Sequence, residues 1–453
     1  MAQMNIAQVE KFEILPSNQP ANNIYSFRNG NPVITFNIGS QSKLLKASTL
    51  RINGELEVLT NAGAIANNNN LKGAGAVGIV TNHRVGASSI IQNVNISSND
   101  TGQTLESVRQ YGRLVASILP STHSLDDFVS NYSTTELNAG LVGLSSNLNN
   151  NRVSFSIRLM AGMLNGGQAI PMGVNGVRGL QISIELASDQ QVLSGAQAAL
   201  AGGAFYQVRN LSLTGDMLVP DANGLQQLAV PGNGSFSYNS YNNLYSVIDS
   251  SDSTQTYNLA NSNVLNVFHN FLPVSHANSY GQDSFSTNLP QLTNAAGTVY
   301  NGGNIQLNKV AFSRGGMKLA LDYDLNVQTQ SQQGRPLTAV NINALDAIMP
   351  YSSISHLSNQ PSNEGFGGSD EVVYESNGTQ QTFTQANPAA SGRNFAIGVA
   401  LDNISGVGID FRGQSYATRI QSNLDGKSPN AVYTYVLSKN TLVYSPQGIQ
   451  VQS

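Results

Sequence analysis

One segment of the sequence matches a motif for binding nucleotides. Gly73-Ala-Gly75-Ala-Val-Gly78 satisfies G-x-G-x-x-G, a pattern whose glycines let backbone amides approach a pyrophosphate at the start of a helix. The segment follows an Asn-rich stretch rather than a strand, however, and no helical pattern comes after it. We therefore predict that it is a loop and that it binds no dinucleotide.

Two pairs of aspartates are spaced closely enough to share a cation or to act as an acid and a base. Asp322 and Asp324 occupy alternate positions of a predicted strand, so their side chains share one face. Leu321, Tyr323 and Leu325 alternate with these aspartates and are expected to point into the core, so both carboxylates are expected to face water. Asp249 and Asp252 lie in a segment that lacks the further oxygens and the glycine spacing of calcium loops. We predict a solvated strand face and an ordinary turn.

Nucleophiles and transition-metal ligands are no better supported. Ser40-x-x-Lys43 matches the first element of an acylating serine site, but the S-D-N and K-T-G elements that accompany it are absent. The chain has no cysteine, which excludes disulfides, thiolate metal sites and thiol nucleophiles together. No metal-ligand spacing relates the five histidines, which are His83, His123, His269, His276 and His356. We therefore predict a protein that is not an enzyme, with no catalytic, cofactor-binding or metal-binding residue and no cofactor.

The composition favours contacts with proteins over contacts with nucleic acids. Of the 453 residues, 40% are hydrophobic and only 11% are charged. A surface of uncharged polar side chains can be buried against a partner without desolvating many ions. The net charge is -4 and the 22 Lys and Arg residues are scattered singly, whereas tight binding to phosphates needs clustered cations. We expect no specific nucleic-acid binding.

The sequence shows no pattern that predicts a targeting signal or a membrane span. The first ten residues lack a basic segment followed by an apolar one, as a signal peptide would have. No later stretch of apolar residues approaches the length that crosses a bilayer. We expect no transmembrane segment and no cleaved leader.

The elements that position the side chains are predicted to be strands in both halves of the chain. Apolar residues alternate with polar ones, which is typical of strands with one buried face. These runs comprise Leu50, Ile52, Leu56 and Val58; Val153, Phe155, Ile157 and Leu159; Leu180, Ile182, Ile184 and Leu186; Met317, Leu319, Leu321, Tyr323, Leu325 and Val327; and Phe395, Ile397, Val399 and Leu401. An all-β fold follows.

Helical patterns are few and short. Residues 104–119 carry apolar side chains spaced for one helical face, and Pro120 predicts where that helix stops. Ser124 and Asp127 predict the start of a second helix, and residues 342–349 predict a third. Each is expected to lie in a connection between strands.

Turns and loops punctuate the strands. Asn-Gly pairs such as Asn29-Gly30 predict turns, because both residues tolerate positive φ. Asn53-Gly54 interrupts a regular strand, where a bulge is as well supported as a turn. Residues 61–78 and 360–391 carry no strand pattern and are predicted to be exposed loops.

Chain length and a weak internal repeat predict two tandem domains. A chain of 453 residues exceeds what one hydrophobic core usually supports. Ile118-Leu119-Pro120 is echoed by Ile348-Met349-Pro350, which favours a duplicated domain. Prolines and glycines break the strand pattern between Asp216 and Gly234. We predict an N-terminal arm at residues 1–23, a first domain at 24–219 and a second at 220–453.

Four segments give the chain a family resemblance. They are Asn23-Ile-Tyr-Ser-Phe-Arg-Asn-Gly-Asn31; Val153-Ser-Phe-Ser-Ile-Arg-Leu159 with Gln168-Ala-Ile-Pro-Met172; Leu180 to Leu186; and the ending from Tyr433 to Ile449. With them the chain resembles the double jelly-roll major capsid proteins of polinton-like viruses and virophages, a lineage that shares its fold with adenoviruses and tailless bacteriophages. The resemblance implies two tandem eight-stranded antiparallel jelly rolls with a few short helices in loops.

The resemblance also implies a function and partners. Three subunits of this family form a pseudo-hexagonal capsomer that tiles an icosahedral shell. The implied partners are further copies of the chain, neighbouring capsomers, and penton, minor or cement capsid proteins. The implied location is the virion, assembled inside the host cell.

Two other readings remain open from the residues alone. A β-rich adhesin or surface-layer module would bind glycans through exposed aromatic platforms, for which Tyr238, Tyr241 and Tyr245 are candidates, although the chain has no Trp. A polysaccharide-active enzyme would need two convergent carboxylates in a groove, and no pattern in the sequence places such a pair.

Overall fold

The computed structural model describes most of both halves of the chain. The described residues are 6–39, 42–59, 80–81, 85–122, 152–165, 169–173, 178–194, 203–224, 234–278, 284–285, 292–293, 299–300, 307–319, 323–324, 371–374, 380–383, 397–401, 407–422, 429–445 and 448–452. Among them strands dominate and helices are short, as the alternating pattern predicts.

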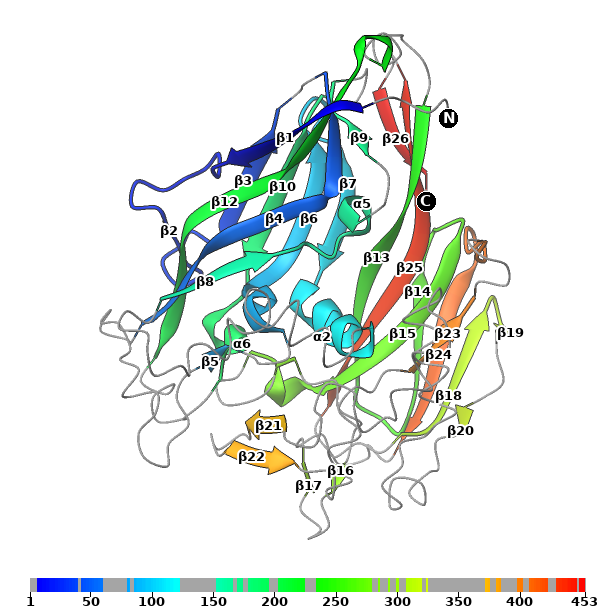
Figure 1. Cartoon of the computed structure of the whole chain (residues 1–453). Helices are drawn as coiled ribbons and strands as arrows, with labels where there is room; N and C mark the ends of the chain where they lie inside the picture. Colours follow the sequence, from blue (N-terminus) through cyan, green and yellow to red (C-terminus); the bar gives the residue numbers. More distant parts are fainter. Residues whose placement is uncertain are drawn as a thin grey trace.

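The first half of the chain forms a sandwich of two antiparallel sheets (Figure 1). One sheet has the order β1 (Ile6–Ile14), β12 (Phe205–Pro220), β4 (Leu44–Leu59) and β8 (Arg152–Ile157), with β2 (Ile24–Tyr25) beside β12 and β9 (Ile170–Pro171) beside β4. The facing sheet has the order β3 (Val33–Ile38), β10 (Leu180–Leu186), β6 (Ile91–Ser98) and β7 (Thr104–Arg109).

The second half repeats this arrangement. One sheet has the order β13 (Gly234–Ile248), β25 (Asn430–Ser445), β15 (Val264–Pro273) and β23 (Ile397–Ala400), with β26 (Gly448–Gln452) beside β25. The facing sheet has the order β14 (Asp252–Asn258), β24 (Ser415–Ser422), β18 (Leu307–Arg314) and β19 (Met317–Lys318), with β20 (Tyr323–Asp324) beside β18.

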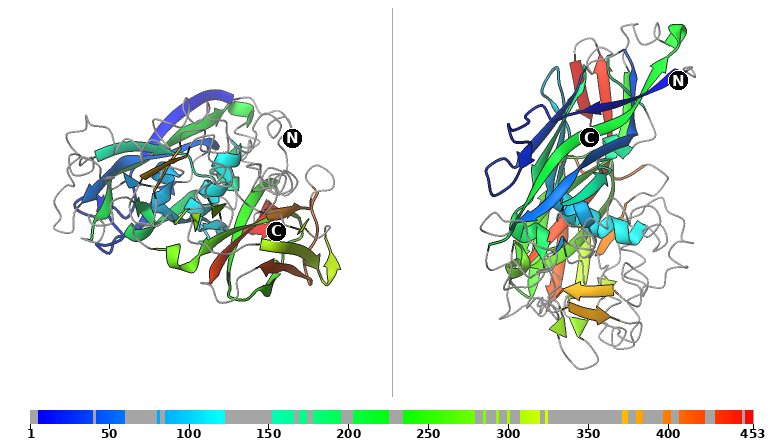
Figure 2. Two further views of the ribbon diagram at one scale, coloured as in Figure 1. Left: turned by 90° about the horizontal axis from the view of Figure 1, so that it is seen from below. Right: turned by 60° about the vertical axis from the view of Figure 1, so that its left-hand side comes forward.

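Both sandwiches have the strand order of a jelly roll. If the eight main strands of each half are counted along the chain, one sheet is ordered first, eighth, third, sixth and the other second, seventh, fourth, fifth. Two Greek keys wound together produce this order. The fold is therefore two tandem antiparallel jelly rolls, as expected, and the two rolls lie side by side when seen from below (Figure 2).

Smaller elements lie in the connections. Three two-stranded ladders pair β5 (Val80–Thr81) with β11 (Leu193–Ser194), β16 (Leu292–Thr293) with β17 (Val299–Tyr300), and β21 (Glu371–Tyr374) with β22 (Gln380–Phe383). The labelled helices in the described part of the chain are η1 (Gly86–Ile90), α2 (Tyr111–Thr122), α5 (Gly162–Asn165), α6 (Asp189–Val192) and η4 (Val274–His276). The hairpin of β21 and β22 falls within residues 360–391, where we expected only loop; its strands contain Val372, Val373 and Phe383, which favour extended backbone.

The N-terminal segment differs from the expected arm. Ile6–Ile14 form β1, which pairs antiparallel with β12 along its length and supplies the first strand of the first roll. The residues of an edge strand are often polar and only partly buried. Because β1 has this character, residues 1–23 resemble a free arm in the sequence. The division at residues 219 and 220 stays a prediction; β12 ends at Pro220 and β13 begins at Gly234.

The start of the helix predicted over residues 104–119 is also corrected. Thr104–Arg109 form β7, which pairs with β6, and the helix α2 begins only at Tyr111. The helix also continues past Pro120, where it was expected to stop, and ends at Thr122. Between them Gln110 has a φ of 52°, which turns the chain from the strand into the helix. Leu105 and Val108 are buried by pairing with β6, and this tertiary contact decides the strand conformation.

Neither the turn nor the bulge considered at Asn53-Gly54 occurs there, and the bulge lies in the neighbouring strand. β4 is continuous, whereas the register of its partner β12 shifts between Arg209 and Ser212, where Asn210 has a φ of 50°. Gly54 is needed because a Cβ there would overlap the side chains of Leu211 and Phe155.

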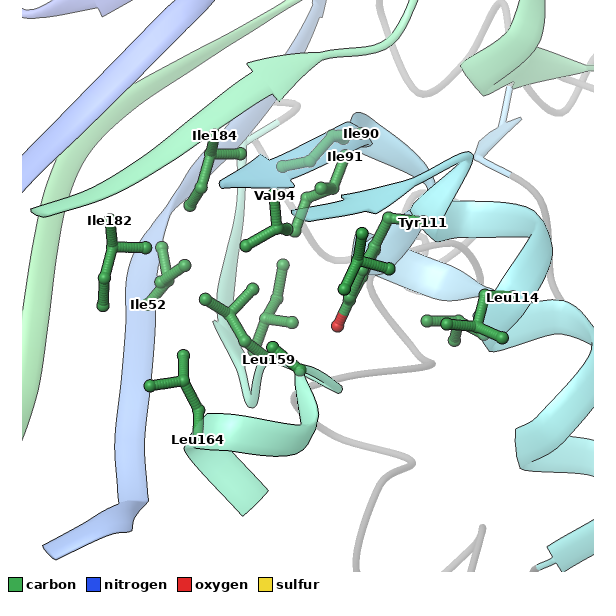
Figure 3. Close-up of a cluster of buried hydrophobic side chains, with 14 of the residues drawn as sticks. Ile52, Ile90, Ile91, Val94, Tyr111, Leu114, Leu159, Leu164, Ile182 and Ile184 are labelled. Carbon is green, nitrogen blue, oxygen red and sulfur yellow. The ribbon is translucent and has the colours of Figure 1, made fainter. Parts of the chain in front are cut away.

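The core of the first roll comes from the alternating residues that the sequence indicates. Ile182 and Ile184 of β10 point toward Ile52 of β4 across the sandwich, and Leu159 and Leu164 close the space below them (Figure 3). One residue of the second-half pattern behaves differently: Met317 is exposed at the start of β19.

The central strands of the second roll are buried on both faces. Phe268 and Leu272 of β15 join the core cluster of the first roll, whereas Val267 and Phe271 join the core between the two sheets of the second roll. β25 alternates in the same way, with Tyr435 on one side and Val436 on the other. The first roll therefore covers one face of this sheet, and the two rolls form one packed unit.

Candidate functional site, the seam between the two rolls

Several buried polar side chains lie where the two rolls meet, among them Glu106, Arg113 and Asn270. We call this contact the seam: α2, β7 and α5 of the first roll against the sheet of β13, β25 and β15 in the second. Polar groups buried away from water need hydrogen-bond partners, and at the seam many of these partners belong to the opposite roll.

Arg113 of α2 is the largest fully buried side chain. Its guanidinium lies over the ring of Tyr433, 4.2 Å from the ring centroid, and donates a hydrogen bond of 2.5 Å to the backbone oxygen of Ser284. Both partners belong to the second roll. A desolvated guanidinium stacked on an aromatic face is stabilising by about 2 kcal/mol.

Further hydrogen bonds cross the seam between side chains and backbone. The hydroxyl of Tyr238 donates to the backbone oxygen of Leu105 at 2.6 Å, and that of Tyr435 to Gln110 at 3.4 Å. The side-chain amide of Asn270 donates to the hydroxyl of Ser117 on α2. These bonds fix the orientation of α2 and β7 on the sheet, because each requires its own donor and acceptor geometry.

Glycine permits the closest approach of the two rolls. A Cβ on Gly162 of α5 would overlap the backbone carbonyl of Asn239 in β13. Gly112 of α2 is similarly tight, because a Cβ there would meet the ring of Phe285. The seam is therefore a backbone-to-backbone contact at α5 as well as a side-chain contact at α2.

Glu106 belongs to β7, and its buried carboxyl group lies against the first residues of α5. Its two oxygens accept hydrogen bonds from the backbone amides of Gly162 and Met163, at 2.9 and 2.8 Å, and the hydroxyl of Ser240 from the second roll also bonds to it. Burial raises the pKa of Glu106 to about 7, because desolvation of the charge outweighs these three hydrogen bonds.

This pKa predicts how stability depends on pH. The folded chain keeps the proton of Glu106 between pH 4.5 and about 7, where the unfolded chain has released it. The contribution of Glu106 to the free energy of unfolding is therefore fully present below pH 4.5. It is lost as the pH rises through 7, by up to about 3 kcal/mol. Glu106→Gln carries no titrating proton, so its loss of stability from pH 4.5 to 8 is expected to be smaller than that of the unsubstituted chain.

Urea unfolding of both proteins at several pH values, followed by circular dichroism, measures the difference. Glu185→Gln serves as the control, because that carboxylate lies exposed on β10. Parallel curves for the Glu106 variant and the unsubstituted chain would contradict the prediction.

Two of the five histidines lie among the described residues, and both are buried. His269 lies in the core of the second roll, with Nδ1 2.8 Å from Oγ1 of Thr434 and Nε2 2.9 Å from the hydroxyl of Tyr416. Burial lowers the pKa of His269 to about 3, so the ring is neutral. His276 is buried at the end of η4. His83, His123 and His356 lie outside the described residues.

The aspartates and the lysine singled out by motif make ordinary structural contacts. Asp252 accepts hydrogen bonds from Arg419 and Gln421, which lower the pKa of Asp252 to about 2. Lys43 forms an ion pair of 2.5 Å with Glu10 of β1. Asp324 lies in β20, where its register partner is Lys309. The segment Gly73 to Gly78, with Ser40 and Asp322, lies outside the described residues.

The three tyrosines proposed as a glycan platform do not form one surface. Tyr238 is buried in the seam, and Tyr241 packs edge-on against Phe268 with 6.4 Å between ring centroids. Tyr245 is exposed and packs against Tyr433. Two of the three rings therefore serve the contact between the rolls.

Neither a metal cluster nor a membrane-spanning helix occurs among the described residues. Within them, no three His, Cys, Asp or Glu side chains come together as a metal ion would require. None of the helices in that part of the chain has the length and apolar character needed to cross a membrane.

Sequence reasoning missed the two charged residues that matter most at the seam. Arg113 lies within the largely apolar segment Tyr111 to Ile118, whereas Glu106 follows Leu105 in a segment of mixed polarity. A charged residue within an apolar run is a signal for a buried polar contact. The sequence alone does not say what covers it.

The fold and the seam define the class of protein. It is a double jelly roll, in which two jelly rolls of the same strand order pack side by side into one unit. Solved structures of the same fold include viral capsid proteins. The chain matches the capsid of the virus PBCV-1 with a TM-score of 0.59 and 13% identity, over 100% of this chain and 98% of that chain. It matches the Faustovirus major capsid protein with a TM-score of 0.59 and 10% identity, over 98% and 92%.

A third match is the cryo-EM structure of the Sputnik virophage, with a TM-score of 0.57 and 12% identity, over 100% of this chain and 89% of that chain. No family model and no curated protein sequence matches the chain. The chain has the double jelly-roll fold of these major capsid proteins.

Proposed function

We propose that this protein is the major structural subunit of an icosahedral viral capsid and acts without catalysis or a cofactor. The observation that carries the proposal is the pairing of two jelly rolls of identical strand order across a buried seam. The likeness of the whole chain to the capsid proteins of PBCV-1 and Faustovirus supports it. Such a unit presents two similar lobes, which suits a repetitive shell.

The proposed assembly is a homotrimer. Three copies with two lobes each provide six comparable lobes, which can tile a pseudo-hexagonal lattice although the symmetry is only threefold. The proposed partners are other copies of the chain, neighbouring capsomers, and penton and minor or cement proteins. The proposed location is the virion, with assembly inside the host cell and no specific nucleic-acid binding.

We propose a domain division directly after β12, whose last residue, Pro220, pairs in register with Ile6 of β1; this lies one residue beyond the predicted division at 219 and 220. The described strands β1 to β12 pair among themselves, and those from β13 onward do the same. The first domain then extends back to β1 rather than beginning at residue 24.

The solution mass tests the proposal. Light scattering on the purified chain is expected to give three times 48.0 kDa, which is 144 kDa, and negative-stain images of the same peak should show a hexagonal outline. A particle of 48.0 kDa at all protein concentrations would contradict the proposal.

A further inference from the structure

Asparagine followed by glycine is a dipeptide that can modify itself in water. The backbone nitrogen of the glycine loses its proton and attacks Cγ of the asparagine side chain. A bond forms between these two atoms, the bond from Cγ to Nδ2 breaks, and ammonia leaves, which gives a succinimide ring. Water then opens either carbonyl of the ring, so the product is aspartate or isoaspartate. Glycine permits the attack because it has no Cβ to obstruct the approach.

Three Asn-Gly pairs lie wholly within the described residues. They are Asn29-Gly30, Asn53-Gly54 and Asn223-Gly224. The reaction requires a side-chain amide that can turn toward the backbone and a glycine nitrogen that can give up its proton. The surroundings of each pair in the fold therefore decide how fast it reacts.

Asn29-Gly30 lies in the turn between β2 and β3, and both residues are exposed. Gly30 has a φ of 80°, and a Cβ added there would meet nothing within 4 Å. Its amide donates only a long hydrogen bond, of 3.4 Å, to the backbone oxygen of Phe27, and a bond of this length is weak. Within the described part of the chain, no hydrogen bond holds the side-chain amide of Asn29. Both reacting groups are thus available.

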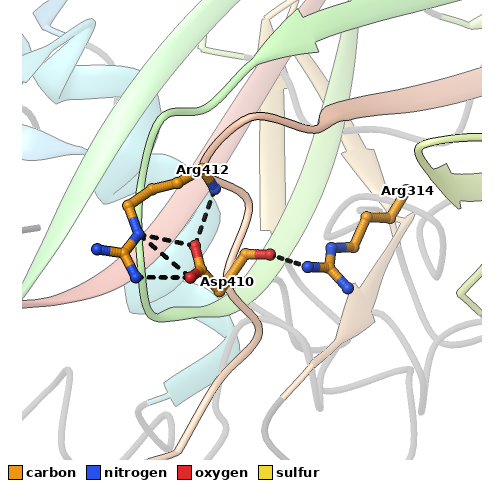
Figure 4. Close-up of polar contacts among 3 residues, drawn as sticks. All are labelled: Arg314, Asp410 and Arg412. Carbon is orange, nitrogen blue, oxygen red and sulfur yellow. Dashed lines mark hydrogen bonds and ion pairs between the residues drawn. The ribbon is translucent and has the colours of Figure 1, made fainter.

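Exposure alone does not leave such a side chain free to turn. The side chain of Asp410 is 43% exposed in a loop of the second roll. Its carboxylate accepts hydrogen bonds from the backbone amide and the guanidinium of Arg412, and Arg314 donates to its backbone oxygen (Figure 4). Charge-assisted bonds of this kind fix the orientation of the group. Among the described residues, the amide of Asn29 has no such bonds.

Asn223-Gly224 differs from Asn29-Gly30 at the glycine nitrogen. Asn223 is exposed in the turn that follows β12. The amide of Gly224, however, donates a hydrogen bond of 2.7 Å to Oδ1 of Asp221. A carboxylate bound to an N–H group disfavours the loss of its proton, because removal would place two negative charges side by side. We therefore expect this pair to react slowly.

Asn53-Gly54 is held by a sheet. Gly54 is buried in β4, which pairs with β12 on one side and with β8 on the other. The side-chain amide of Asn53 donates a hydrogen bond of 2.9 Å to Oγ1 of Thr214. Ring closure here requires β4 to leave the ladder, and opening a central strand costs far more free energy than moving a turn.

We propose that Asn29 is a site of spontaneous deamidation and isoaspartate formation in the folded protein, and that the fold protects Asn53 and Asn223. The reaction needs water as its only co-reactant and no assembly partner. It therefore goes beyond the proposed function and does not depend on it.

The modification changes the turn between β2 and β3. Either product replaces a neutral amide by a carboxylate next to Arg28, whose guanidinium stacks on Phe205 and donates to the backbone oxygen of Gly203. Isoaspartate also adds a methylene group to the backbone of a turn that two hydrogen bonds between Ser26 and Asn31 close. The first roll thus gains a negative charge at this turn as the protein ages.

Peptide mapping by mass spectrometry tests the proposal. The purified chain is incubated in mildly alkaline buffer and digested, and the mass gain from exchange of NH₂ for OH is followed at each pair. A protein-isoaspartate methyltransferase with a labelled methyl donor identifies the isoaspartate. Asn29 is expected to convert at least about tenfold faster than Asn53 or Asn223, because the other two pairs must first open a hydrogen-bonded structure.

The same chain unfolded in guanidinium chloride is the reference, in which the three pairs are expected to convert at similar rates. Asn29→Gln is expected to remove the product at this turn, because glutamine would have to close a larger ring. Asp221→Ala releases the amide of Gly224 and is expected to raise the rate at Asn223 about tenfold. Circular dichroism checks that each variant is folded.

Two results would overturn the proposal. One is equal conversion of the three pairs in the folded chain. The other is an unmodified Asn29 in the folded chain under conditions in which the unfolded chain reacts. An unchanged rate at Asn223 in the Asp221→Ala protein would overturn the protection assigned to that carboxylate.

Discussion

Gly162→Ala is expected to destabilise the protein by about 3 kcal/mol or more, one of the largest effects of any single methyl group in this chain. The added Cβ would overlap the backbone carbonyl of Asn239 across the seam. A side chain in that place could rotate away, but backbone within the long ladder of β13 and β25 cannot move without breaking hydrogen bonds. The rolls must therefore separate or shift.

Urea unfolding followed by circular dichroism and by tyrosine fluorescence measures this effect, since the chain has 17 Tyr and no Trp. The control is Gly39→Ala, because nothing lies within 4 Å of a Cβ at that position. The control should unfold at the urea concentration of the unsubstituted chain. If Gly162→Ala does so as well, the seam is not the tight contact that the structure describes.

Arg113→Ala is expected to cost about 3 to 5 kcal/mol. The substitution removes a fully buried side chain, its stacking on Tyr433 and its hydrogen bond to Ser284. It leaves a cavity at the centre of the seam and an unpaired backbone oxygen. Because the partners belong to the second roll, the rolls should also become separable, which limited proteolysis of the native protein would detect as faster cleavage between them.

The matched control removes the same charge from the surface. Arg419 pairs with Asp252 and both side chains are exposed, so Arg419→Ala is expected to change stability by less than about 1 kcal/mol. Arg113→Met restores most of the volume without the charge and should recover part of the loss. Equal stabilities of the Arg113→Ala and Arg419→Ala proteins would show that the seam does not depend on this residue.

Local patterns were sufficient for the strands of the sandwich but not for every boundary. Leu180 to Leu186 and Leu50 to Val58 read correctly as strands, because one buried face imposes a period of two on the sequence. The same logic failed at residues 104–109. Leu105 and Val108 fit a helix as well as a strand, and pairing with β6 decided between them.

Local patterns could not predict the contact between the two rolls. β15 is buried at all ten positions, with Asn266, His269 and Asn270 among apolar neighbours. A sandwich strand normally faces water on one side, so a run without alternation shows that something covers both faces. It does not show that the cover is the other roll of the same chain.

By itself the sequence determined the all-β class and the absence of cysteine chemistry, and it favoured a duplicated domain, since periodicity and composition are local properties that each segment carries whatever surrounds it. Only the tertiary structure placed β1 in the first sheet, brought Arg113 onto Tyr433 and buried Gly54 while it left Gly30 exposed. These features depend on contacts between residues far apart in the chain. Such contacts arise when two sheets with complementary faces pack together, and no single segment encodes both faces.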